Sequence, residues 1–119
     1  MENKEFAKKL EGRTKNFAVT IIQLSGKLPA TPECKVIRYQ VTKSGTSIGA
    51  NYHEANRSRS KADFSSKIRT CEFEASETVY WLRILYELGW IPVDYLNQVL
   101  TEATELLTIF TSVGKSLHP

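Results

Sequence analysis

The sequence of 119 residues has no uninterrupted apolar run that approaches the roughly 18 residues of a membrane-spanning helix. Its first residues, MENKEFAKKLEGRTK, are charged throughout and lack the apolar core of a signal peptide. These absences argue against a membrane protein and against secretion, so the expected location is the cytoplasm. The length suits one folded unit, and we expect a single domain over residues 1–119.

Cysteine and histidine are also scarce, with two residues of each kind. Cys34 and Cys71 lack the CxxC spacing of a metal or redox site, so we expect reduced thiols that face the core. Arg57 stands four residues after His53, where the zinc motif HExxH would need a second histidine. His118 lies at the C-terminal end. We therefore predict no metal, no cofactor and no catalytic residues, and a protein that is not an enzyme.

Turn-forming residues interrupt the chain at three places, in the segments LPATPE, NRSRSKAD and GWIPVD. Between these segments apolar residues recur every three or four positions, which is the spacing of one helix face. No window alternates polar and apolar residues long enough to predict a strand. The sequence predicts four helices, over about residues 3–27, 33–57, 62–89 and 93–116. Short connections between long helices predict an all-α, antiparallel up-down-up-down four-helix bundle with left-handed crossings.

The core-facing stripe of the second predicted helix is less apolar than the stripes of the other three. This stripe contains Asn51, and Glu54 lies one step away from it. Gly45 and Gly49 lower helix stability by about 0.5–1 kcal/mol each, but they would let a neighbouring helix approach closely. A buried polar group needs a partner. The expected partners on the third helix are Glu77, Thr78 and Arg83. The residues predicted to form structural polar contacts or a subunit interface are Ser47, Asn51, Glu54, Ser58 and Glu77.

Charge is distributed unevenly along the chain. Residues 1–70 carry 14 Lys or Arg and six Asp or Glu, a net charge of +8, whereas residues 71–119 carry two and seven, a net charge of −5. A basic surface and an acidic surface on one body can hold an anionic polymer, or can let copies of the protein meet head to tail.

The turn after the second predicted helix is the most basic part of the chain. Clustered cations with serines between them are typical of phosphate binding, because they combine charge with orienting hydroxyl groups. The predicted nucleic-acid contacts are Lys43, Arg57, Arg59, Lys61 and Lys67. Two alternatives stay open for this cluster: a solvated turn, and a contact with the acidic surface of a neighbouring subunit.

The segment SGTSIGANYHEANRSRSKADFSSKIRTCEFEASETVYWLRIL, residues 44–85, resembles a bacterial family. It is a family of four-helix-bundle proteins encoded by intervening sequences of large-subunit ribosomal RNA genes. The features that carry the resemblance are Ser47-Ile48, Asn51, Glu54, Arg57-Ser58, Phe64, Ala75-Ser76-Glu77, Leu82 and Leu85. Tyr52-His53 and Ala55 stand where the family usually has other residues.

The resemblance implies a left-handed bundle that assembles as a homopentameric ring. It also implies similarity in fold to the accessory proteins of diversity-generating retroelements, which bind nucleic acid and a reverse transcriptase. The family name records where the genes lie and implies no settled activity. We therefore predict a homo-oligomer, a pentamer, whose basic surface binds RNA or DNA. The alternative is an adaptor or assembly module whose charges serve only protein contacts.

Overall fold

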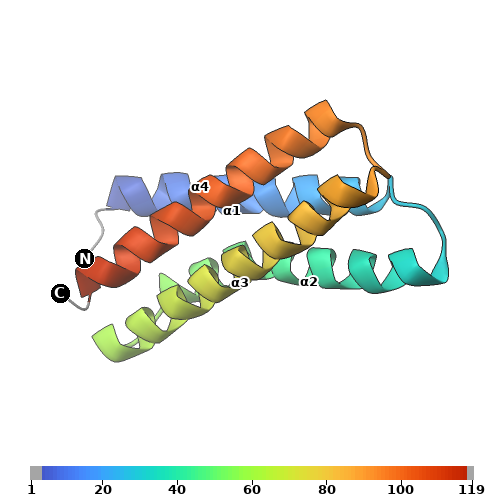
Figure 1. Ribbon diagram of the computed structural model, residues 1–119. Coiled ribbons are helices and arrows are strands. Elements are labelled where there is room, and N and C mark those ends of the chain that lie inside the picture. Colours follow the sequence, from blue (N-terminus) through green and yellow to red (C-terminus); the bar gives the residue numbers. More distant parts are fainter. Residues whose placement is uncertain (1–3, 118–119) are drawn as a thin grey trace.

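The structure, a computed structural model, describes residues 4–117 and contains four α-helices (Figure 1). The helices are α1 (Lys4–Ser25), α2 (Pro32–Ala55), α3 (Lys61–Leu88) and α4 (Val93–Leu117). Residues 4–117 contain no strand, so the predicted all-α class and the predicted number of helices are confirmed. The six helix ends that lie inside the described residues are within two residues of the predicted ends. His118 lies outside the described residues.

The helix ends follow from capping side chains in the sequence. The Thr31 hydroxyl accepts a hydrogen bond from the amide of Cys34 (3.2 Å), which caps the start of α2. Ser60 caps α3 in the same way, because its hydroxyl accepts from the amide of Asp63 (3.0 Å). Gly89 ends α3 in the left-handed region, with φ of 69°, where glycine carries no steric penalty.

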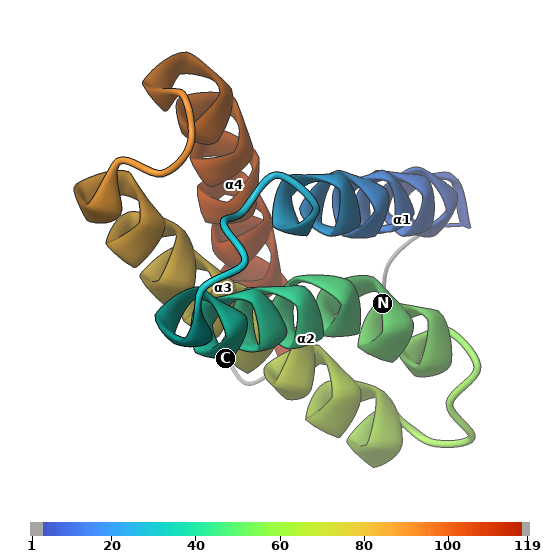
Figure 2. The same cartoon turned by 90° about the vertical axis from the view of Figure 1, so that its right-hand side faces the viewer.

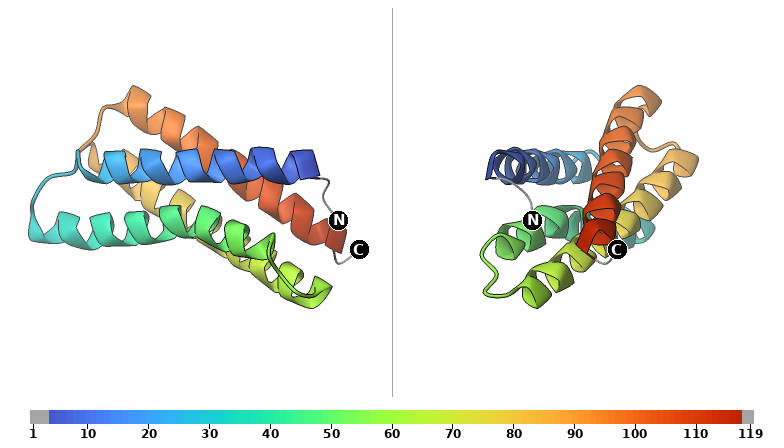
Figure 3. Two further views of the ribbon diagram at one scale, coloured as in Figure 1. Left: turned by 180° about the vertical axis from the view of Figure 1, so that it is seen from behind. Right: turned by 90° about the vertical axis from the view of Figure 1, so that its left-hand side faces the viewer.

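Consecutive helices run in alternating directions along an elongated body of 44 × 24 × 23 Å (Figure 1). The α2–α3 connection lies at one end, and the α1–α2 and α3–α4 connections lie at the other. Along the chain each helix packs on the next, whereas α1 and α4 touch over only a short stretch. Viewed along the body, the α3–α4 pair is inclined to the α1–α2 pair (Figure 2). As a result α4 crosses α1 at an angle (Figure 3). The left-handed crossing stays a prediction.

All four helices contribute side chains to one core, which includes Ile21, Ile48, Leu82 and Phe110 as fully buried residues. The rings of Tyr52 and Phe110 meet edge to face, with centroids 5.4 Å apart, and join α2 to α4. Both cysteines are buried in this core, and the Cys71 thiol donates a hydrogen bond to the Ile48 carbonyl (3.5 Å). Among residues 4–117, none of the helices is long and apolar enough to cross a membrane.

The two glycines inside α2 mark where α1 approaches most closely. A Cβ atom on Gly45 would lie 2.8 Å from Cγ1 of Ile21, and one on Gly49 would lie 3.2 Å from the backbone of Thr14. A side chain at either position would therefore push α1 away from α2. The prediction that these small residues admit a neighbouring helix is confirmed, and that helix is α1.

Candidate functional site

A pocket of about 620 Å³ opens at the end of the molecule that carries the α2–α3 connection. Its walls come from three parts of the chain: the first two turns of α1, the end of α2 with the connection, and the first turn of α3. The antiparallel arrangement brings these parts together, because α1 begins at the end where α2 finishes (Figure 1). Four of the residues that line the pocket are cations, namely Lys4, Lys8, Arg59 and Lys61.

These four cations are exposed, and none of them forms an ion pair with any residue between 4 and 117. The carboxylate that lines the pocket, Glu11, is already engaged. It accepts a hydrogen bond from the Asn56 amide (2.8 Å) and lies 3.5 Å from Arg57 Nη1 and 3.5 Å from His53 Nδ1. Its negative charge is therefore directed at α2, and the pocket keeps a strongly positive rim.

The structure places the five predicted phosphate contacts in four different settings. Arg59 and Lys61 line the pocket. Arg57, at the same end, donates a hydrogen bond to the His53 carbonyl (2.7 Å) and contacts Glu11. Lys43 lies 14 residues before Arg57, so about 21 Å separates them along the helix axis. Lys43 therefore does not belong to this site.

Lys67, the fifth predicted contact, pairs with Glu54 across the α2–α3 corner, with Nζ and Oε1 2.9 Å apart. The hydrogen bond between them, more than the charge attraction, lowers the pKa of the Glu54 carboxyl and raises the pKa of the Lys67 ammonium. Glu54 is exposed, whereas the sequence predicted it beside the buried stripe. Its partner lies on α3, but it is Lys67 and not the expected Glu77, Thr78 or Arg83, and the pair lies at the exposed edge of the corner.

Two of the predicted polar contacts stay within their own helix. The Ser47 hydroxyl donates to the Lys43 carbonyl (2.5 Å), and the Asn51 amide donates to the Ser47 carbonyl (2.8 Å). Both bonds span four residues, because a short polar side chain on a helix can reach the carbonyl one turn earlier. The expected partner of Asn51 on α3 is therefore replaced by the backbone of α2.

Glu77 also bonds within its own helix: it is exposed on α3 and accepts a hydrogen bond from Nε1 of Trp81 (3.2 Å), four residues later. Ser58 differs from this pattern. The Ser58 hydroxyl is shielded from solvent and has no hydrogen-bond partner among residues 4–117. Ser58 also lines the pocket with Arg59 and Lys61, although its hydroxyl oxygen is itself shielded from solvent.

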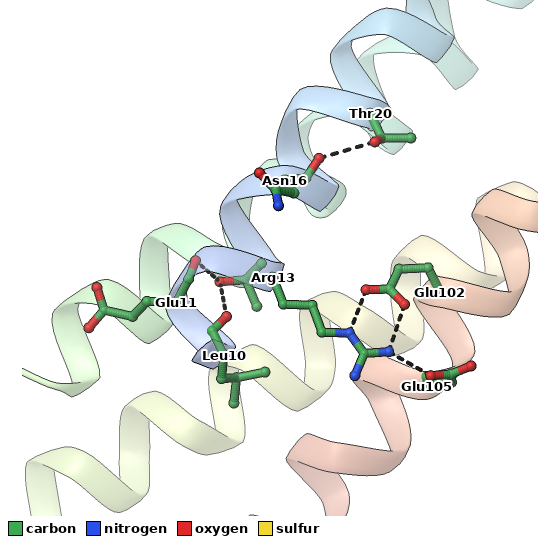
Figure 4. Close-up of polar contacts among 8 residues, drawn as sticks. Leu10, Glu11, Arg13, Asn16, Thr20, Glu102 and Glu105 are labelled. Carbon is green, nitrogen blue, oxygen red and sulfur yellow. Dashed lines mark hydrogen bonds and ion pairs between the residues drawn. The ribbon is translucent and has the colours of Figure 1, made fainter. Parts of the chain in front are cut away.

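A second polar cluster lies away from the pocket and joins α1 to α4. Arg13 donates to Glu102 through Nε (2.6 Å) and Nη2 (2.7 Å), and Nη2 also contacts Glu105 at 2.5 Å (Figure 4). The hydrogen bond to Glu102 is the main reason why the pKa of Arg13 is raised. With its charge neutralised by two carboxylates, this arginine serves to hold the helices together and is not available to an anion.

The sequence matches a model of the family described as 23S rRNA-intervening sequence protein over residues 5–112. The chain belongs to this family. A solved structure with a similar fold is a protein of unknown function from the S23 ribosomal protein family of Bacteroides thetaiotaomicron. The two chains are 34% identical, the match covers 88% of this chain and 97% of that chain, and the TM-score is 0.82. A comparison with curated proteins finds no significant match.

Two residues of the pocket, Lys4 and Lys8, were not predicted from the sequence. Their spacing of four residues places both on one face of α1, which was visible in the sequence. The sequence did not show that this face of α1 would meet the α2–α3 connection. Among residues 4–117, no group of three or more His, Cys, Asp or Glu side chains could hold a metal ion.

Proposed function

We propose that this intervening-sequence protein is a non-enzymatic homo-oligomer, a pentamer, that binds the backbone of RNA or DNA through its basic end. The observation that carries this proposal is the convergence of Lys4, Lys8, Arg59 and Lys61 on one pocket without ion-pair partners from residues 4–117. Like charges so placed repel one another, so an anionic ligand that contacts them lowers their electrostatic energy. Phosphate groups at regular spacing satisfy several such cations at once.

Two neighbouring ion pairs engage acidic side chains at this basic end. Arg57 lies against Glu11, and Lys67 against Glu54, so two acidic residues of the same corner are neutralised within the chain. Neither of these acidic residues forms an ion pair with the four pocket cations. In this proposal Arg57 and Lys67 act by masking carboxylates, while Arg59 and Lys61 contact phosphate.

Exposed apolar side chains and the uneven distribution of charge among the helices support the homo-oligomer. On α3, Phe73 and Tyr80 are 65% and 58% exposed, and their spacing of seven residues places both on one face. Surfaces of this kind are commonly covered by another chain. In addition, α1 carries five cations and two acids, whereas residues 71–88 of α3 carry four acids and one cation. Such complementary surfaces suit a ring, in which each subunit offers different faces to its two neighbours.

Binding to a labelled single-stranded RNA and to a DNA duplex, measured by fluorescence anisotropy at several salt concentrations, tests the proposal. We expect affinity to fall steeply between about 50 and 200 mM salt. Lys61→Glu should weaken binding and reduce the salt slope by about one or more. The matched control is Lys35→Glu: both lysines are exposed in the first turn of a helix, but Lys35 lies at the opposite end of the molecule. This control should bind as the wild type does.

If neither nucleic acid binds at low salt, the proposal fails and the adaptor alternative takes its place. The exposed aromatic residues on α3 are what would favour that alternative. A reverse transcriptase as partner rests on resemblance in fold alone and stays a prediction. The mass in solution, five times the 13.5 kDa of the chain for a pentamer, tests the assembly independently of any ligand.

A further inference from the structure

The pocket at the basic end is more than a charged surface, because its volume of about 620 Å³ lies in the range of sites that take small molecules. Phosphates on the outside of a nucleic acid need only an exposed row of cations. They do not explain why a pocket of this size lies beneath those cations. The composition of its walls indicates what else it could hold.

Its inner wall is apolar and includes an aromatic ring. Ala55 is buried, and Phe64 is half-buried, packs against the core and lines the pocket. Ala7 adds a third apolar side chain from α1. An aromatic ring held by the core offers a surface on which a nucleic-acid base can stack without ordering a mobile side chain.

The pocket also offers cations on two of its sides. Lys4 and Lys8 lie on the α1 side, and Arg59 and Lys61 lie on the side of the α2–α3 connection. Ser58 also lines the pocket, but its hydroxyl oxygen is shielded from solvent. The polar recognition therefore comes from the four cations, which a phosphate group at the pocket could contact from both sides.

We infer that this pocket binds one unpaired nucleotide of a single-stranded nucleic acid, with its base against Phe64 and its phosphates at the surrounding cations. The inference rests on the proposed function and narrows it from nucleic acid in general to single strands. A base inside a duplex is stacked on both faces and paired along its edge, so it cannot enter a pocket unless the helix is opened.

The test compares a labelled single-stranded oligonucleotide with a duplex of the same length, using Phe64→Leu and the control Tyr86→Leu. Leucine keeps an apolar side chain against the core but removes the aromatic face. Tyr86 is also an aromatic residue of α3, is 43% exposed and lies outside the pocket. We expect the wild type to prefer the single strand, and Phe64→Leu to weaken single-strand binding about tenfold while leaving duplex binding unchanged. Tyr86→Leu should change neither.

A second variant and a competition experiment keep the inference testable if Phe64→Leu folds poorly. Ala7→Leu narrows the pocket from α1 without altering the core side, and it should also weaken single-strand binding selectively. A nucleoside monophosphate should displace the strand at a lower concentration than inorganic phosphate does, because only the former carries a base.

The possible results separate this inference from the proposed function. Equal binding of single strand and duplex, unaffected by Phe64→Leu and Ala7→Leu, would leave backbone binding intact and overturn the nucleotide pocket. Equal displacement by inorganic phosphate and by the nucleoside monophosphate would overturn it too. Absence of all binding at low salt would remove the proposed function itself, and the nucleotide pocket with it.

Discussion

Arg13 of α1 donates two hydrogen bonds to the Glu102 carboxylate of α4, from Nε to Oε2 at 2.6 Å and from Nη2 to Oε1 at 2.7 Å (Figure 4). The two helices share only a short contact, since α4 crosses α1 at an angle (Figure 3). The Arg13–Glu102 pair therefore connects α1 and α4 at a place where the two helices pack over only a small area. Two parallel hydrogen bonds also restrict how the helices can rotate against each other.

Replacing Arg13 with alanine should lower the free energy of unfolding by about 1 kcal/mol. The side chains of Arg13 and Glu102 are 36% and 31% exposed, so water screens the pair and keeps its contribution below that of a buried one. Urea unfolding at one fixed protein concentration measures the change. Lys9→Ala is the control, because the Lys9–Glu5 pair is almost fully exposed and should contribute less than about 0.5 kcal/mol. Equal losses in the two variants would contradict a special role for Arg13.

Gly45→Ala should destabilise the protein although alanine is the better helix former. The new Cβ would lie 2.8 Å from Cγ1 of Ile21, which is fully buried. Overpacking costs about 1–3 kcal/mol, and the gain in helix propensity offsets about 0.5–1 kcal/mol of it. We expect a net loss of about 1 kcal/mol in urea unfolding.

Gly12→Ala is the matched control for this prediction. Gly12 lies inside α1, and a Cβ there would have no atom within 4 Å. The substitution should therefore show only the helix-propensity effect and raise stability by about 0.5–1 kcal/mol. If both variants change stability in the same direction, the close approach of α1 and α2 at Gly45 does not constrain the fold.

The helices were predictable from the sequence because their signals are local. Apolar residues at three- and four-residue steps mark the buried faces, and the ends are marked by Thr31, Ser60 and Gly89, whose roles depend only on nearby residues. The small residues of α2 likewise indicated a close neighbour. Which helix that neighbour would be depended on tertiary packing.

The site was less predictable, because it is assembled from segments far apart in the chain. Lys4 and Lys8 join Arg59 and Lys61 only through the antiparallel placement of α1 beside the α2–α3 connection. Lys43 was predicted to contact phosphate together with Arg59 and Lys61, but the rise of the helix separates it from Arg57 by about 21 Å. A count of charges along the chain does not show which cations are left without partners.

Glu74→Gln should raise stability at neutral pH. Partial burial, and to a lesser degree the nearby Glu77, raise the pKa of the Glu74 carboxyl above its ordinary value of 4.5, against the opposing effect of Lys43. The ionised form is thus disfavoured in the folded protein. The cost is present above the raised pKa and is gone below 4.5, where the group is protonated in both states. The stability difference between the variant and the wild type should therefore shrink as pH falls into that window.

The same substitution at Glu54 should act with the opposite sign. The hydrogen bond to Lys67 lowers the pKa of the Glu54 carboxyl below 4.5, so the ionised form favours folding. Its contribution is present above 4.5 and is lost as pH falls through the lowered pKa. Glu54→Gln should reduce stability at neutral pH and have no effect in strong acid. Thermal unfolding of both variants across the acid range checks the two signs, and a shared sign would contradict one of the assigned environments.

Tyr80→Glu should reduce the mass of the assembly, if the exposed aromatic face of α3 is a subunit contact. Tyr80 is 58% exposed and shares its face with Phe73, so a carboxylate there would have to be desolvated between two subunits. Tyr86→Glu is the control on the same helix: six residues further on, it projects about 120° around the axis from Tyr80. Native mass spectrometry should find monomers of 13.5 kDa for Tyr80→Glu and the wild-type assembly for Tyr86→Glu. An unchanged mass for Tyr80→Glu, with helical content retained, would place the subunit contact on another surface.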